Sequence, residues 1–170
     1  TFAVHRFRFP GVDVSAHIAR RYPHNELASH AIGYVGRISE KELKIFDATN
    51  YKGTSHVGKA GIEKSYESVL HGQVGFEQVE VNAVGRIIRT LERTPPVPGS
   101  NVYLTLDINL QKAAKKAIGN HYGSVMAIDV TNGELLAFVS TPGFDPNEFV
   151  SGLSTAQYKA LYENPFRPMF

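Results

Sequence analysis

The sequence of 170 residues contains no cysteine and no tryptophan. Without cysteine the chain has neither disulfides nor cysteine-ligated zinc sites. Charge of one sign is also scarce, because 18 Lys and Arg stand against 16 Asp and Glu, giving a formal net charge of +2. Such a small excess does not indicate a nucleic-acid or membrane-surface partner. No apolar run approaches the roughly 20 residues of a membrane-spanning helix, and no signal peptide is visible.

What remains is an ordinary globular composition, with 42% hydrophobic and 20% charged residues. The length allows one domain or two small ones. The chain begins with Thr1 rather than Met and stops at the apolar stretch NPFRPMF. We therefore expect an internal segment of a longer protein, with targeting and anchoring elements upstream and catalytic residues downstream.

Local patterns in the first hundred residues predict short helices and one extended hairpin. Residues 12–22 alternate as a strand does, and 28–36 and 39–48 read as helices, the second with Ser39 as its N-cap and Glu42 three residues later. Residues 61–72 predict one helix that ends at a glycine. Residues 73–81 and 86–94 predict the two strands of a hairpin.

The stretch TPPVPGSN, residues 94–101, contains three prolines and a glycine and predicts a stiff, extended connector between two regions. Beyond it, 102–106 reads as a strand, and Asp107 is a good N-cap for a helix over 108–121. The apolar stripe expected on that helix consists of Leu110, Ala114, Ala117 and Ile118.

A second hairpin is predicted around Asn132 and Gly133, a pair that favours a tight turn. Its strands, 124–130 and 134–140, are apolar on nearly every residue, so we expect other elements to cover both faces of this sheet. A final helix over 154–164 has Ser154 as its N-cap. The fold class that follows is α+β, with separate helices and antiparallel hairpins.

A near match to a phosphate-binding loop spans Gly53, Gly58 and Lys59 at the P-loop spacing. The next residue is Ala60, which has no hydroxyl for magnesium, and the preceding KIFDATNYK does not resemble a buried strand. A flexible glycine turn leading into a helix is the simpler interpretation. A phosphate-binding domain stays as the alternative that these glycines leave open, and we expect no nucleotide partner.

Other catalytic candidates are weak. The seven histidines form no H-x-H, no H-E-x-x-H and no pair four residues apart, which argues against a zinc site. The carboxylate pairs Glu77 with Glu80 and Asp129 with Glu134 read as solvated surface. No serine lies in G-x-S-x-G or is followed by Lys three residues later. We therefore assign no catalytic residue, no metal and no cofactor to this chain.

The long stretches from GKAGIEKSYESVLHGQVGFEQVEV to YLTLDINLQ, and then SVMAIDVTNGELLAFVSTPGFDPNEFVSGLS, resemble the class B penicillin-binding proteins. Within them the chain is most similar to the peptidoglycan D,D-transpeptidases of rod elongation. This resemblance implies a membrane anchor, an elongated N-terminal pedestal and a transpeptidase domain. Residues 1–98 would then be the pedestal, a dimerisation-type domain. Residues 99–170 would begin an α/β transpeptidase domain that is incomplete here.

The resemblance also assigns a structural motif. Its members are glycines and polar residues that shape turns: Gly58, Gly61, Glu63, Asn82, Gly85 and Arg86. The glycines would let the chain turn sharply, and Glu63 would pair with an arginine inside the pedestal. The family's catalytic motifs Ser-x-x-Lys, Ser-x-Asn and Lys-Thr/Ser-Gly do not occur in this sequence. The parent protein would be a serine acyl-enzyme, while this segment holds none of its catalytic motifs.

The same resemblance implies partners and a location. The pedestal would bind the scaffold protein MreC and help to regulate the glycosyltransferase RodA, in the periplasm of a cell whose inner membrane anchors the parent. Peptidoglycan stem peptides and β-lactams would be ligands of the parent only. Aromatic residues near expected loops are candidate contacts: Phe7, Phe9, Tyr34 and Phe76. A pure spacer without partner binding is the alternative.

The absence of a Ser-x-x-Lys motif leads to a first prediction. Incubation of this chain with penicillin should give no covalent adduct, because no serine has the lysine that would activate it. Intact-mass spectrometry measures the outcome. A stoichiometric mass increase on any serine would contradict this interpretation.

Overall fold

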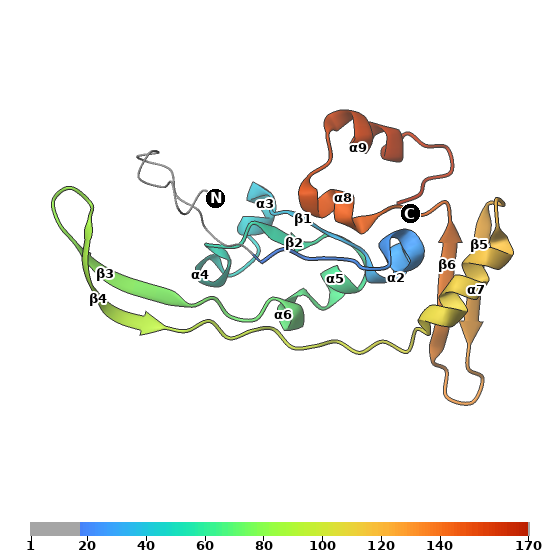
Figure 1. The fold of residues 1–170 in the computed structure, drawn as a ribbon, viewed down its shortest axis with the longest axis horizontal. Coiled ribbons are helices and arrows are strands. Elements are labelled where there is room, and N and C mark those ends of the chain that lie inside the picture. The colour runs from blue at the N-terminus through green and yellow to red at the C-terminus, as the bar shows by residue number, and fades with distance from the viewer. Residues whose placement is uncertain (1–17, 170) are drawn as a thin grey trace, which may run out of the picture.

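The computed structural model describes residues 18–169, which form an elongated molecule of short helices and small antiparallel sheets (Figure 1). The described strands make three separate two-stranded sheets, β1 with β2, β3 with β4, and β5 with β6. This arrangement confirms the α+β class. Within residues 18–169, no helix is both long and apolar enough to cross a bilayer.

The central body is built around the sheet of β1 (Val35–Arg37) and β2 (His56–Gly58). Short helices surround it, and their bounds are η2 (Asn25–Ala28), α2 (Ser29–Ile32), α3 (Glu40–Leu43), α4 (Ala48–Tyr51), α5 (Gly61–Ser65) and α6 (Glu67–Leu70). Val35 and Val57 are buried in this small core. Because each helix is only about one turn long, tertiary contacts rather than helix propensity must hold them in place.

A long hairpin of β3 (Phe76–Val81) and β4 (Ile87–Thr94) projects from one end of the body (Figure 1). Its register pairs Phe76 with Thr94 and Val81 with Ile87. The Asn82 side chain shapes the tip, since its Oδ1 accepts hydrogen bonds from the N–H groups of Val84 (3.0 Å) and Arg86 (2.9 Å). The expected hairpin and its turn are therefore present.

The proline-rich connector is extended, as expected, but it lies along the body rather than free of it. Gln73 and Val97 exchange two backbone hydrogen bonds of 2.8 and 2.9 Å, and Ser100 N–H donates to the Val69 carbonyl at 2.8 Å. The strand predicted over 102–106 is wrong. That segment forms no ladder. Its Thr105 hydroxyl donates to the Leu135 carbonyl at 2.7 Å, and the N–H of Asp107, the residue after the segment, donates to the Leu136 carbonyl at 2.8 Å.

At the other end of the molecule, α7 (Ile108–Ile118) packs on the hairpin of β5 (Gly123–Ile128) and β6 (Leu135–Thr141). Asp107 caps the helix as predicted, and Gly133 takes the left-handed conformation of the expected turn, with φ of 79°. The apolar stripe was only partly right, because the helix buries Ala114 and Gln111 while Ala117 is exposed.

Gln111 is completely buried and replaces a neighbouring strand at the edge of β6. Its Oε1 accepts from the Phe138 N–H at 2.7 Å, and its Nε2 donates to the Phe138 carbonyl at 3.1 Å. A buried amide of this kind must be fully bonded to be tolerated. The side chain thus satisfies backbone groups that would otherwise lie unpaired at the sheet edge.

The chain closes with α8 (Pro146–Ser151) and α9 (Thr155–Tyr162). Ser154 caps α9 in a capping box with Gln157, as predicted. The sequence analysis missed α8, although Asp145 as N-cap and Pro146 in the first turn are standard signals for a helix start.

Four other expectations need correction. Residues 18–22 are not a strand, and 12–17 lie outside the described residues. The helix expected over 28–36 ends at Ile32 and is followed by β1, because the left-handed Gly33 turns the chain into that sheet. The helix expected over 61–72 is two helices with a break at Tyr66. The expected cover on both faces of the β5–β6 sheet is also wrong for β5, since the side chains of Met126 and Ile128 are more than half exposed.

The capping box at α3 leads to a prediction about acid stability. Partial burial opposes ionisation of Glu42, but hydrogen bonds from Lys59 Nζ and from the Ser39 hydroxyl and N–H outweigh it and lower the pKa of Glu42 to about 2. Since the pKa is lower in the folded than in the unfolded state, this contribution is complete above pH 4.5 and is lost as the pH falls towards 2.

Glu42→Gln should therefore flatten the fall in melting temperature between pH 4.5 and pH 2. Glu40→Gln is the matched control, because Glu40 is exposed in the same helical turn and should leave the profile unchanged. Thermal melts across this range test the prediction. Identical profiles for Glu42→Gln and the unmodified chain would contradict it.

Candidate functional site

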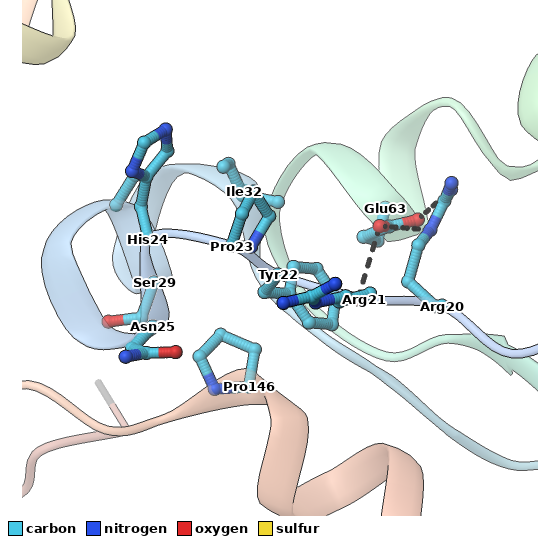
Figure 2. Close-up of a pocket in the computed structure, with 11 residues that line it drawn as sticks. Arg20, Arg21, Tyr22, Pro23, His24, Asn25, Ser29, Ile32, Glu63 and Pro146 are labelled. Carbon is cyan, nitrogen blue, oxygen red and sulfur yellow. Dashed lines mark hydrogen bonds and ion pairs between the residues drawn. The ribbon is translucent and has the colours of Figure 1, made fainter.

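The buried carboxylate of Glu63 lies where the extended segment 18–22, β1 and α5 meet (Figure 2). Glu63 is only 4% exposed, and both of its oxygens are bonded to Arg20. Arg20 Nε lies 2.7 Å from Oε1, and Nη2 donates to Oε2 at 2.7 Å, so the guanidinium binds the carboxylate in a bidentate manner. The pairing of Glu63 with an arginine is therefore observed, and we call this ion pair with Tyr22 the Glu63 cluster.

Tyr22 completes the cluster. Its hydroxyl donates to Glu63 Oε1 at 3.1 Å and accepts a hydrogen bond from the Val35 N–H at 3.0 Å. The phenol thus links α5 to the start of β1 in the interior of the body. Neither Arg20 nor Tyr22 was identified from the sequence as a partner of Glu63, because contacts across more than forty residues leave no periodic pattern.

The electrostatics of the cluster favour the charged guanidinium of Arg20 and the neutral phenol of Tyr22. Burial opposes the charged form of Arg20, but the hydrogen bond and charge of Glu63 outweigh it, so the pKa of Arg20 is raised. Burial, and then the negative charge of Glu63, raises the pKa of Tyr22. At neutral pH the phenol keeps its proton and can donate it to Glu63, which is the bond that the geometry shows.

Two motif glycines are structural because side chains have no room there. A Cβ on Gly58 would lie 2.2 Å from the Glu63 carbonyl oxygen, and one on Gly61 would lie 2.7 Å from the carbonyl oxygen of Ala31. Gly61 also has a left-handed backbone, with φ of 58°. β2, α2 and α5 can therefore approach closely enough to bury Glu63 only with glycine at these positions.

A second carboxylate, Glu67, supports the same body and was also missed. Its Oε2 accepts from the Gly58 N–H at 2.8 Å, and its Oε1 accepts from the Tyr51 hydroxyl at 3.2 Å. Tyr51 is buried between the rings of Phe46 and His71, with ring centroids 4.5 and 4.1 Å away. Burial, with the charge and hydrogen bond of Glu67, raises the pKa of Tyr51 to about 12.

The body and the second region contact each other directly. The amide of Asn147 at the start of α8 pairs with the backbone of Tyr22 through two bonds of 2.9 Å. The ring of Tyr34 on the body packs on Phe149 and Phe144, with centroids 3.9 and 5.7 Å apart. Lys115 of α7 forms an ion pair of 3.0 Å with Glu26.

The structure does not gather all the predicted motif residues into one site. Gly58 and Gly61 lie beside Glu63 in the body. Asn82, Gly85 and Arg86 lie instead at the tip of the projecting hairpin (Figure 1). Of the candidate aromatic contacts, Phe76 is 59% exposed and Tyr34 is half-buried against α8. Phe7 and Phe9 lie outside the described residues.

A small cavity lies beside the Glu63 cluster. It has a volume of about 220 Å³ and is lined by apolar side chains and by Arg20, Tyr22 and His24 (Figure 2). Ser29 also lines the cavity, and its hydroxyl donates to the Glu26 carbonyl at 3.0 Å.

Lys59, the lysine of the near P-loop match, forms an ion pair with Glu42. Across residues 18–169, no three acidic or histidine side chains converge as metal ligands.

Comparison with known families identifies the class of protein. The profile of the penicillin-binding protein dimerisation domain matches residues 1–104, which is more than half of the sequence. The chain belongs to this family. The resemblance seen in the sequence is therefore confirmed, and Arg20, Tyr22 and Glu63 lie within the matched part.

Two similar relatives are named as transpeptidases. The peptidoglycan D,D-transpeptidase MrdA of Acinetobacter baumannii is 45% identical over 169 residues, covering 99% of this chain and 25% of that protein. MrdA of Escherichia coli K12 is 44% identical over 172 residues, covering 99% of this chain and 27% of that protein. The chain thus spans about a quarter of the length of these relatives.

Solved structures agree with this placement. Penicillin-binding protein 2 (PBP2) of Pseudomonas aeruginosa, in complex with WCK 5153, is 42% identical with a TM-score of 0.77, covering 93% of this chain and 31% of that one. A chain in the complex between PBP2 and MreC from Helicobacter pylori is 36% identical with a TM-score of 0.85, and the match covers 99% of this chain and 31% of that one. The fold is that of the pedestal region of PBP2-like transpeptidases.

The close packing at Gly58 leads to a prediction with an internal control. Gly58→Ala should destabilise the chain by about 1–3 kcal/mol or more, because the new methyl group would overlap the Glu63 carbonyl. Gly53→Ala, in the same glycine-rich stretch, meets no atom within 4 Å and should change stability by less than about 0.5 kcal/mol. Urea denaturation measures both. Equal destabilisation by the two substitutions would refute the packing argument.

Removal of the buried carboxylate should also be costly. Glu63→Ala leaves Arg20 and the Tyr22 hydroxyl without their acceptor, and we expect a loss of about 3 kcal/mol. Lys64→Ala, on the same helix but exposed, is the control and should have little effect. The measurement is the free energy of unfolding at neutral pH. A Glu63→Ala chain as stable as the Lys64→Ala control would contradict the claim that the Glu63 cluster stabilises the body.

Proposed function

We propose that this chain is a non-catalytic segment of a peptidoglycan D,D-transpeptidase that acts in bacterial cell-wall elongation. Residues 1–98 would form the pedestal and residues 99–170 the start of the transpeptidase domain. The observation that carries the proposal is the likeness in fold, over 99% of the chain, to PBP2 in its complex with MreC. The named relatives, which are peptidoglycan D,D-transpeptidases, support the reaction class of the parent.

The parent enzyme would use a serine nucleophile supplied by another part of the protein. That serine would attack the penultimate D-Ala of a stem peptide, release the last D-Ala and pass the acyl group to the amine of a neighbouring peptide. β-Lactams would acylate the same serine. The location that suits this substrate is the periplasm, with the parent anchored in the inner membrane.

The role proposed for the pedestal is to position the catalytic domain and to bind a partner of the elongation complex. The body is stiffened by the Glu63 cluster, and the β3–β4 hairpin extends from it with exposed apolar side chains such as Phe76, Ile87 and Leu91. Exposed apolar and aromatic side chains on a supported arm are what a protein-binding surface requires. MreC is the partner that we propose, and RodA is a second partner of the same complex.

A binding experiment separates this role from that of a spacer. Phe76→Asp should weaken binding to the cognate MreC by about tenfold or more, since truncating a central aromatic anchor typically costs more than 1 kcal/mol. Tyr103→Asp is the matched control, because Tyr103 is 90% exposed and lies outside the hairpin, in the segment that follows the connector. Titration calorimetry measures binding, and thermal melts show that both variants are folded. Should no exposed substitution on the hairpin weaken binding, the spacer interpretation would be the better one.

A further inference from the structure

Tyr22 is the one described residue that bonds to the core of the pedestal with its side chain and to α8 with its backbone. Its hydroxyl contacts Glu63 and Val35, as described above. Its N–H donates to Asn147 Oδ1 at 2.9 Å, and its carbonyl accepts from Asn147 Nδ2 at 2.9 Å. The two sets of bonds belong to one residue, so a displacement of the Tyr22 backbone also shifts its hydroxyl.

The Asn147 amide is held ready for this contact. The backbone N–H of Asn147 donates to Asp145 Oδ1 at 2.9 Å, and the side-chain Nδ2 donates to the same oxygen at 2.7 Å. Asp145 is the N-cap of α8, so the orientation of the amide is tied to the axis of that helix. Because the amide meets Tyr22 through both a donor and an acceptor, it fixes an angle as well as a distance, as a pair of strand residues does.

The other contacts between the two regions constrain direction less. The packing of Tyr34 on Phe149 and Phe144 is apolar and tolerates sliding. In the ion pair of Lys115 with Glu26, the Glu26 side chain is 50% exposed, and such pairs are weak. The bond from Gln111 Nε2 to the Leu27 carbonyl is long, at 3.4 Å. Adhesion and orientation thus come from different contacts.

We propose that Tyr22 and Asn147 form a latch that sets the angle of the second region against the pedestal and couples this angle to the Glu63 cluster. The inference deepens the proposed function, because it names the positioning contact through which the pedestal orients the catalytic domain. A change of angle requires that Asn147 leaves Tyr22 or that Tyr22 moves. Movement of Tyr22 withdraws the hydroxyl from Glu63 and Val35.

The latch can be tested by spin-label distance measurement, since a chain without cysteine accepts two labels without background. Ile45→Cys on the body and Val130→Cys at the β5–β6 turn are suitable, because these side chains are 80% and 96% exposed. In the otherwise unmodified chain, the distance distribution should be narrow. Asn147→Ala should widen it by about twofold, as expected when a hinge is freed.

Two comparisons show whether the latch itself is responsible. Asn109→Ala, an exposed asparagine on α7, should leave the distribution narrow. Asn147→Asp keeps an acceptor for the Tyr22 N–H but loses the donor to its carbonyl, and it should widen the distribution as well. This variant decides the question if Asn147→Ala does not fold. A width equal to that of the unmodified chain in the folded Asn147 variants would overturn the latch.

A separate variant tests whether the angle between the two regions is coupled to the Glu63 cluster. Tyr22→Phe keeps the backbone N–H and carbonyl that Asn147 contacts but removes the bonds to Glu63 and Val35, so the proposal expects a wider distribution here too. An unchanged width in folded Tyr22→Phe would overturn the coupling. Because these measurements need no partner protein, their failure is distinguishable from failure to bind MreC, which would count against the proposed function alone.

Discussion

The burial of one carboxylate, that of Glu63, constrains most of the body. An ionised carboxylate removed from water is tolerated only when it is paired and hydrogen-bonded. Here that requirement brings Arg20 and Tyr22, from the extended segment before η2, against α5. It also brings α5 so close to β2 that Gly58 cannot carry a side chain.

The arrangement suits a pedestal. A body of short elements is flexible unless its polar groups are locked, and the Glu63 cluster with Glu67 supplies such locks on both sides of β2. The hairpin that leaves the body is exposed along much of its length, while the second region is held through Tyr22 and α8. Under the proposed function, the hairpin would present a surface to a partner, while Tyr22 and α8 would set the orientation of the second region.

Features set by neighbouring residues could be predicted from the sequence. The caps at Ser39, Asp107 and Ser154 and the turn at Asn132 and Gly133 each depend on side-chain and backbone contacts within a few residues. The same local rules would have found α8, whose Asp-Pro start was overlooked. The resemblance to a family indicated the glycines and Glu63, and geometry then explained why the glycines are needed.

Features that depend on distant partners could not be predicted in this way. The β1–β2 pairing joins three-residue strands about twenty residues apart, too short for an alternating pattern. Gln111 was not identified from the sequence as a buried residue, because its partner, the edge of β6, is visible only in three dimensions. Arg20, Tyr22 and Asn147 have no shared motif, and only the folded chain brings them together.

The central claim is that the Glu63 cluster and its neighbours form the most stable part of the body. Native-state hydrogen exchange measures this directly, since the N–H groups of Tyr22, Val35 and Gly58 each donate to a side chain of this network rather than to a ladder. The account predicts that these three amides exchange slowly and at similar rates, more slowly than those of the β3–β4 hairpin. Exchange at these amides as fast as in the exposed hairpin would contradict it.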